Sequence, residues 1–178
     1  MFKGIVKTFF FIVIAGIAIL IFLSSGNETL KVSRFHITVT GLPEGHEGLK
    51  IAHISDLHGK EFGPHNGELA RAIESLEPDL IFVSGDMINS QNDDGSAFIN
   101  LLYELKGLYP VYCSLGNHEQ IVKGTLGTER YYDFTKRLRE AGGILLDNER
   151  KEIKKSGITF GIYGLTAMLH HYSSHDTL

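Results

Sequence analysis

The sequence has few of the residues that define several protein classes. It contains one cysteine, Cys113, which excludes a disulfide framework within the chain and a zinc site built from thiolates. It has no excess of basic residues, because 21 Asp and Glu outnumber 17 Lys and Arg and give a formal charge of −4. This balance predicts no binding of bulk nucleic acid. With 178 residues, of which 43% are hydrophobic, the chain has the composition of one folded domain.

The amino-terminal segment differs in composition from the rest of the chain. Residues 9–23 are an unbroken apolar run of 15 residues, preceded by Lys3 and Lys7, and no acidic residue occurs before Glu28. A bilayer span needs ~20 residues. The 20 residues from 4 to 23 reach that length if the Lys7 amine extends to the lipid headgroups.

Three interpretations of this segment stay open: an uncleaved signal anchor, a secretory signal cleaved after Gly26, and a buried helix of a soluble domain. Because both lysines precede the apolar run, the positive-inside rule places Met1 in the cytoplasm and the remainder outside. We therefore expect residues 1–26 to be a signal anchor (a transmembrane helix) or a signal peptide, and residues 27–178 to be the folded domain. The expected location is the cell membrane, single-pass with the domain outside the cytoplasm, or alternatively a secreted form.

Residues 27–178 alternate between strand-like and helix-like patterns, and Cys113 falls within an apolar run, which predicts a buried structural thiol. Apolar or β-branched runs predict strands at 30–40, 49–54, 80–83, 111–115, 144–146 and 158–165. Apolar residues at helical spacing predict helices at 69–76, 98–105 and 131–141. The alternating charges of 149–155 predict a solvated turn. The order of the elements predicts an α/β fold with a largely parallel sheet, in which ligands bind at the carboxyl ends of the strands.

Three of the predicted strands end in short polar clusters, Asp56-x-His58, Gly85-Asp86 and Gly116-Asn117-His118-Glu119. Their carboxylate, amide and imidazole groups suit manganese, iron or zinc. An Asp-x-His pair at a strand end directs two side chains toward one cation, and Asp86 could bridge that cation to a second one. Two cations ~3.5–4 Å apart are the usual means of in-line displacement at phosphorus.

The three motifs, in this order, resemble those of the calcineurin-like metallophosphoesterases. The flanking residues are similar to a membrane-associated or secreted bacterial branch of that family, at 49–58, 78–86, 111–119 and 142–165. The resemblance implies a four-layer α/β/β/α sandwich, of which this chain holds the N-terminal part. It also implies a hydrolase that cleaves phosphate esters, phosphodiesters above all.

The resemblance further implies a role for each polar residue. Asp56 and His58 would bind the first divalent metal ion, Asp86 would bridge both, and Asn117 would bind the second. A hydroxide held between the metals would attack phosphorus. The catalytic pair would be His118, which assists the leaving group, and Glu119, which orients His118.

The carboxyl-terminal region departs from the family pattern. Family members carry a further histidine and a later Gly-His-x-His motif, and this sequence has no Gly-His-x-His before it ends at Leu178. We therefore expect a C-terminally truncated chain. The late candidates for a missing ligand are His170, His171 and His175, with solvated loop histidines as the alternative. An alternative function is a catalytically inert remnant that binds metal at the membrane.

Overall fold

The fold is described from a computed structural model, which places residues 30–41, 48–89, 92–125, 128–155 and 157–166. The chain divides into two units, residues 1–36 and 37–178. In the first unit, the described residues 30–36 form no helix or strand. The apolar run at 9–23, and with it the predicted signal segment, lies outside the described residues. Among the residues that the structure describes, no helix is both long and apolar enough to cross a membrane.

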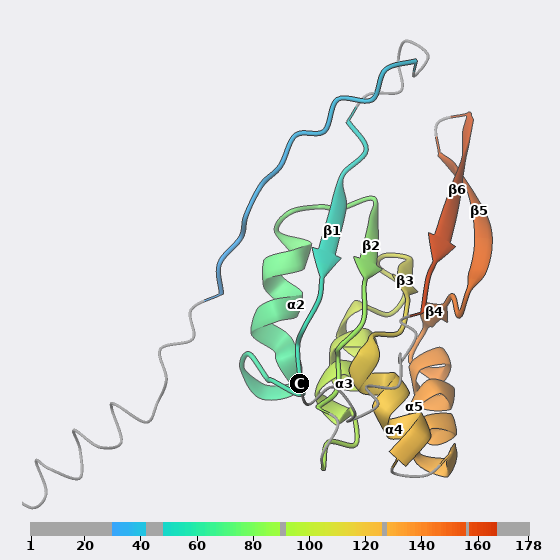
Figure 1. The fold of residues 1–178 in the computed structure, drawn as a ribbon. Coiled ribbons are helices and arrows are strands. Elements are labelled where there is room, and N and C mark those ends of the chain that lie inside the picture. The colour runs from blue at the N-terminus through green and yellow to red at the C-terminus, as the bar shows by residue number, and fades with distance from the viewer. Residues whose placement is uncertain (1–29, 42–47, 90–91, 126–127, 156, 167–178) are drawn as a thin grey trace, which may run out of the picture. The chain divides into compact units, whose positions relative to one another are not determined.

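A four-stranded sheet forms the centre of the second unit (Figure 1). Its strands follow chain order and are all parallel: β1 (Ile51–Ile54), β2 (Leu80–Val83), β3 (Val111–Cys113) and β4 (Gly143–Leu145). Parallel neighbours need crossover connections, and here helices supply them. The helical segments are η1 (Pro64–Asn66), α2 (Gly67–Glu74), α3 (Ser96–Leu105), α4 (Asn117–Thr125) and α5 (Thr128–Glu140). The predicted α/β fold with a parallel sheet is confirmed.

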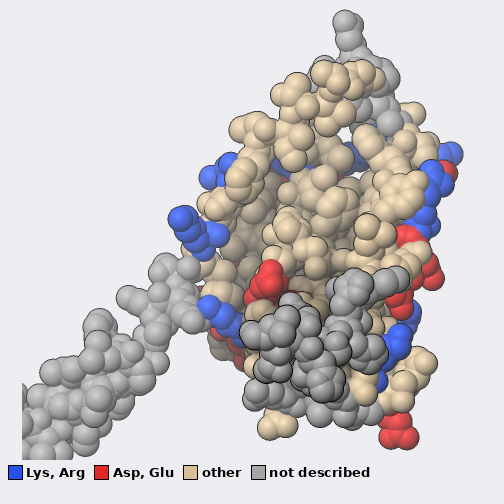
Figure 2. Space-filling view, in the orientation of Figure 1, with Lys and Arg blue, Asp and Glu red and all other residues tan. Residues whose placement is uncertain are grey.

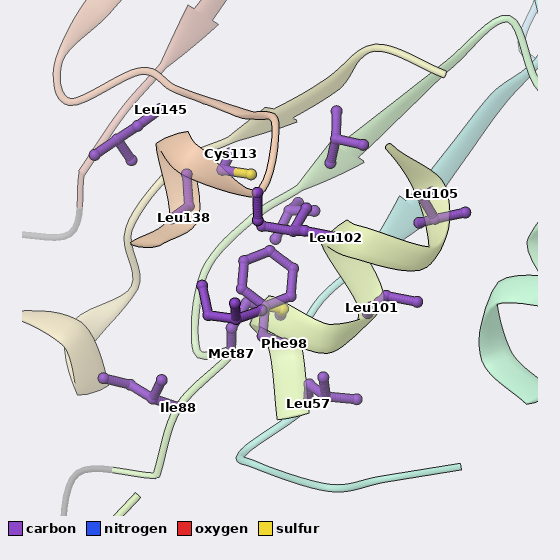
Figure 3. Packing of buried hydrophobic residues seen from close by; sticks show 14 of the residues in the cluster. Leu57, Met87, Ile88, Phe98, Leu101, Leu102, Leu105, Cys113, Leu138 and Leu145 are labelled. Carbon is purple, nitrogen blue, oxygen red and sulfur yellow. The ribbon is translucent and has the colours of Figure 1, made fainter. Parts of the chain in front are cut away.

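The helices pack on one face of this sheet and enclose the main hydrophobic core. Helix α3 is its central element, because six of its ten residues are buried. Figure 3 shows Phe98 and Leu102 of α3 in this cluster, with Met87 close to Phe98. Cys113 is buried in the same core, and burial raises the pKa of its thiol above the usual value. The prediction of a structural thiol is confirmed.

A hairpin of β5 (Glu149–Lys155) and β6 (Ile158–Gly164) covers part of the opposite face. Its Ile153 and Ile162 pack against a second apolar cluster, whose buried members are Leu80, Tyr112 and Leu146. Lys155 also donates a hydrogen bond to Asp79, which lies immediately before β2, with Nζ and Oδ1 2.5 Å apart. That bond lowers the pKa of the Asp79 carboxyl. Figure 2 shows charged side chains along the margin formed by the hairpin, and few over the strands of the sheet.

Two predicted elements are wrong, and one α-helix and the short 3-10 helix η1 were not predicted. Residues 30–40 form no strand, and Phe35 and Ile37 are 84% and 85% exposed. Although β-branched residues alternate in this segment, no strand among the described residues pairs with it. A strand needs such a partner to satisfy the hydrogen-bonding groups of its main chain. Residues 149–155, predicted as a turn, form β5, because pairing with the apolar β6 outweighs their charge. Helix α4, which no apolar pattern predicted, begins at Asn117, inside the third polar motif.

We expect Leu102→Ala to lower the free energy of unfolding by about 2–5 kcal/mol, because it leaves a cavity around a side chain that is 1% exposed. The neighbouring Tyr103 is 52% exposed, so Tyr103→Ala should cost less than about 1 kcal/mol. Urea unfolding followed by circular dichroism measures both. Similar losses for the two variants would contradict the assignment of this face of α3 to the core.

Candidate metal centre

The predicted ligands lie on three loops that leave the same edge of the sheet. The first two loops follow β1 and β2 and carry Asp56 and His58, then Asp86. The third follows β3 and runs into the first turn of α4, which carries Asn117 and His118. Because the strands are parallel and adjacent, their carboxyl ends meet at this edge. The sheet therefore brings together residues that are separated by up to 62 positions in the chain, from Asp56 to His118.

The main-chain pairing of β1 with β2 continues past the ends of both strands. Three further hydrogen bonds join the loops, from Asp56 N to Gly85 O (3.2 Å), His58 N to Asp86 O (3.0 Å) and Gly59 N to Met87 O (2.9 Å). The first two loops are therefore held at the spacing of paired strands. Their ligands cannot move apart without breaking these bonds.

Three ligand residues have left-handed backbone conformations. The φ angles are 54° at Asp56, 48° at His58 and 56° at Asp86. Each such conformation costs a side-chain-bearing residue about 1 kcal/mol or more, so the surroundings must impose it. Leu57 and Met87 do so, because they are 5% and 2% exposed and anchor the loops in the core beside the ligands. The apolar side chains point inward, which leaves the polar ones at the open edge.

Three side chains converge at this edge as a possible metal-binding group. His58, Asp86 and His118 each offer a ligand atom, and these atoms lie within 4.8 Å of one another. The rings of His58 and His118 meet edge to face, with centroids 4.5 Å apart. Asp56 adjoins the group, with its Oδ1 3.8 Å from His58 Nε2. The structure thus brings His118, to which the resemblance gave the role of assisting the leaving group, among the potential ligands.

Asn117 and the late histidines complete the set of predicted ligands. Asn117 is exposed and is the first residue of α4, next to His118. His170, His171 and His175 lie outside the described residues. The donors that are placed, carboxylate oxygens and imidazole nitrogens without sulfur, fit divalent manganese, iron or zinc.

Glu119 lies under the ligand group and is 1% exposed. Its two carboxylate oxygens accept four main-chain hydrogen bonds, from Gly116, Asp86, Met87 and Ile88. Asp86 in turn accepts a bond at Oδ1 from His118 N, at 3.0 Å. The predicted role of Glu119, orientation of the His118 side chain, stays a prediction.

A hollow that the motifs did not predict opens beside His58. It is lined by His58, Gly59, Asn89, Asn92 and Asp93. Asp93 accepts main-chain bonds from Asn89 N and Gly95 N, both at 2.8 Å, which shape this wall. The only signal in the sequence was the polar run at 89–94, which follows Met87 and Ile88.

Several known proteins are similar to this chain. The family model described as calcineurin-like phosphoesterase matches residues 49–175. The uncharacterized metallophosphoesterase YkoQ of Bacillus subtilis is 27% identical over 87% of this chain and 59% of its own length. An uncharacterized metallophosphoesterase of Aquifex aeolicus is 31% identical over 82% of this chain and 54% of its own length. The solved structure of phosphopantetheinyl hydrolase from Mycobacterium tuberculosis matches 65% of this chain and 41% of its own, with 24% identity and a TM-score of 0.44.

The chain belongs to the calcineurin-like phosphoesterase family, a family of metal-dependent hydrolases. It spans somewhat more than half the length of the two curated relatives above. The predicted family resemblance is confirmed.

We expect Gly85→Ala to weaken Mn²⁺ binding at least about tenfold, since displaced supporting groups commonly cost that much. Gly85 has a φ of 92°, and an added Cβ would meet the main-chain nitrogen of Gly116 at 2.2 Å, forcing the second and third loops apart. Titration calorimetry with Mn²⁺ measures the effect.

The matched control is Gly124→Ala, in helix α4, where an added Cβ meets nothing within 4 Å. Alanine should be tolerated there, and by its helix propensity it should add about 0.5–1 kcal/mol of stability. Unchanged Mn²⁺ affinity in Gly85→Ala would contradict the close approach of the two loops.

Proposed function

We propose that this chain hydrolyses phosphate esters, preferentially phosphodiesters, with divalent cations held by Asp56, His58, Asp86 and Asn117. One observation carries the proposal: three separate loops bring ligand atoms of His58, Asp86 and His118 within 4.8 Å of one another. Membership of the phosphoesterase family supports the substrate class. The oxygen-rich donor set also suits cations that bind phosphate oxygens.

In this proposal the role of each residue follows from its position at the edge of the sheet. Asp56 and His58, on the first loop, would hold one cation, Asp86 would be shared, and Asn117 would hold the other. Cations bound there would polarise the phosphoryl oxygens and acidify the attacking water. The loop hydrogen bonds and buried anchors keep the ligands in place before substrate arrives, so little reorganisation accompanies the reaction.

His118 is the proposed proton donor. Water attacks phosphorus and releases a proton to solvent, the bond from phosphorus to the alcohol oxygen breaks, and protonated His118 gives its proton to that leaving oxygen. The products are a phosphomonoester and an alcohol. The main-chain N–H of His118 is bonded to Asp86 Oδ1, which places the histidine at the cluster. The hollow beside His58, with its two asparagines, offers uncharged hydrogen-bonding groups for the ester's alcohol portion.

We expect Asp86→Asn to lower kcat/KM for bis(p-nitrophenyl) phosphate with Mn²⁺ by more than about 100-fold. Loss of a shared ligand should exceed the 10–100-fold effect of supporting groups. The assay uses the full chain kept in detergent, because of its apolar run. The control is Asp133→Asn on the exposed side of α5, which removes only an ion pair with Arg137 and should leave the rate unchanged.

Equal rates for Asp86→Asn and the unsubstituted chain would refute the proposed site. A folded chain that binds Mn²⁺ but shows no turnover would instead favour the alternative function, a metal-binding remnant at the membrane.

We also propose that the chain is anchored by its amino terminus with the phosphoesterase domain outside the cytoplasm. The apolar run behind two lysines supports this, as does a 30% identical relative from Danio rerio described as a transmembrane protein with a metallophosphoesterase domain, matched over half of this chain. Protease added to intact bacterial spheroplasts should digest the domain, and alkaline carbonate should leave the chain in the membrane fraction. A domain that resists protease until the cells are lysed would contradict this orientation.

A further inference from the structure

We infer that Glu119 is a positioning residue, which holds the second and third loops in the geometry that binds metal. The inference rests on the metal site of the proposed function, and it assigns Glu119 a task separate from any effect on the His118 ring. The inference is drawn from the set of main-chain hydrogen bonds that this single buried carboxylate accepts.

The bonds of Glu119 link two loops that no strand pairing joins at this point. Oε2 accepts from Asp86 N and Gly116 N at 3.0 and 2.8 Å, and Oε1 accepts from Met87 N and Ile88 N at 2.9 and 3.2 Å. Oε2 therefore bonds one loop on each side. The side chain is 1% exposed, so water does not compete for these bonds.

The neighbouring glycines show how tightly these two loops pack. An added Cβ at Gly116 would lie 2.1 Å from Asp86 Oδ1 and 2.5 Å from Asp86 N. No side chain fits between the two backbones, so a carboxylate reaching from below is the group that can satisfy the amides of both. Without it, three consecutive N–H groups, at residues 86–88, would lose their acceptor in a buried place.

The effect of Glu119 extends to the first loop through main-chain carbonyls. The residues whose amides it binds, Asp86 and Met87, accept hydrogen bonds at their own carbonyl oxygens from His58 N and Gly59 N. All three ligand loops are thus connected through one carboxylate. A change there should alter ligands on every loop, although Glu119 itself need not touch a cation.

The chemistry of these contacts requires a carboxylate. All four partners are donors, and a carboxylate presents acceptors only. Glutamine would turn an NH₂ group toward two of the amides. Glu119→Gln therefore keeps the shape of the side chain and removes the acceptor for those two amides. Bonds from amides to a charged oxygen are also stronger than neutral ones.

We expect Glu119→Gln to weaken Mn²⁺ binding by the full chain about 10–100-fold in titration calorimetry, while circular dichroism shows a folded protein. The matched control is Val122→Ala, on the same helix α4, where the side chain is likewise 1% exposed. This control should unfold at a lower temperature yet bind Mn²⁺ like the unsubstituted chain. A folded Glu119→Gln protein with unchanged Mn²⁺ affinity would overturn the inference.

Hydrogen exchange of the unsubstituted, metal-free chain provides a second measurement that needs no variant. The amides of Asp86, Met87 and Ile88 lie beyond the end of β2, yet they should be as protected as those of the strand. Exchange at the rate of an open loop would overturn the inference even if Glu119→Gln fails to fold. Neither measurement uses hydrolysis, so an inactive chain would refute the proposed function and leave the role of Glu119 standing.

Discussion

The parallel pairing of β1, β2 and β3 is the constraint on which the site depends. Parallel neighbours place their carboxyl ends at one edge, and here the ladder between the first two strands continues through Asp56, His58 and Gly59. The ligands are therefore positioned by main-chain hydrogen bonds that belong to the sheet as much as to the site. The four α-helices pack on one face of the sheet, and the first turn of α4 itself contributes Asn117 and His118 at this edge. The same topology that builds the core thus gathers the polar residues.

Stability and function share the same short segments. Leu57 and Met87 are buried beside exposed or half-buried polar neighbours, and each ligand loop has at least one such anchor. The left-handed conformations of Asp56, His58 and Asp86 store strain that these anchors and the loop bonds offset. The packing of these neighbours thus fixes the strained loops, and with them the candidate ligands, in one conformation, which is a form of preorganisation. Packing of this kind can hold carboxylate and imidazole groups near one another at the edge of an α/β sheet.

Sequence patterns predicted the helices and strands best where burial and periodicity agree. The strands at 80–83 and 111–115 and the helix at 98–105 were found because their residues are apolar on the faces that pack. Patterns failed where a partner decides the conformation. Residues 30–40 alternate like a strand but have no described neighbour to pair with, whereas 149–155 look like a solvated turn and pair fully with β6. Pairing is a property of two segments, so neither segment's composition reveals it.

The sequence by itself determined the identity and order of the candidate ligand residues, because carboxylate, amide and imidazole groups after successive apolar runs predict both a parallel α/β sheet and a class of cation. The tertiary structure alone decided what Glu119 does. Its partners are main-chain amides, which every residue except proline carries, so no residue type in the sequence marks them. The approach of His118 to His58 and the hollow at Asn89 and Asn92 likewise come from the packing of loops distant in the chain. The residue type alone gives the chemistry of a side chain, whereas the contacts of that side chain with the main chain exist only once the chain has folded.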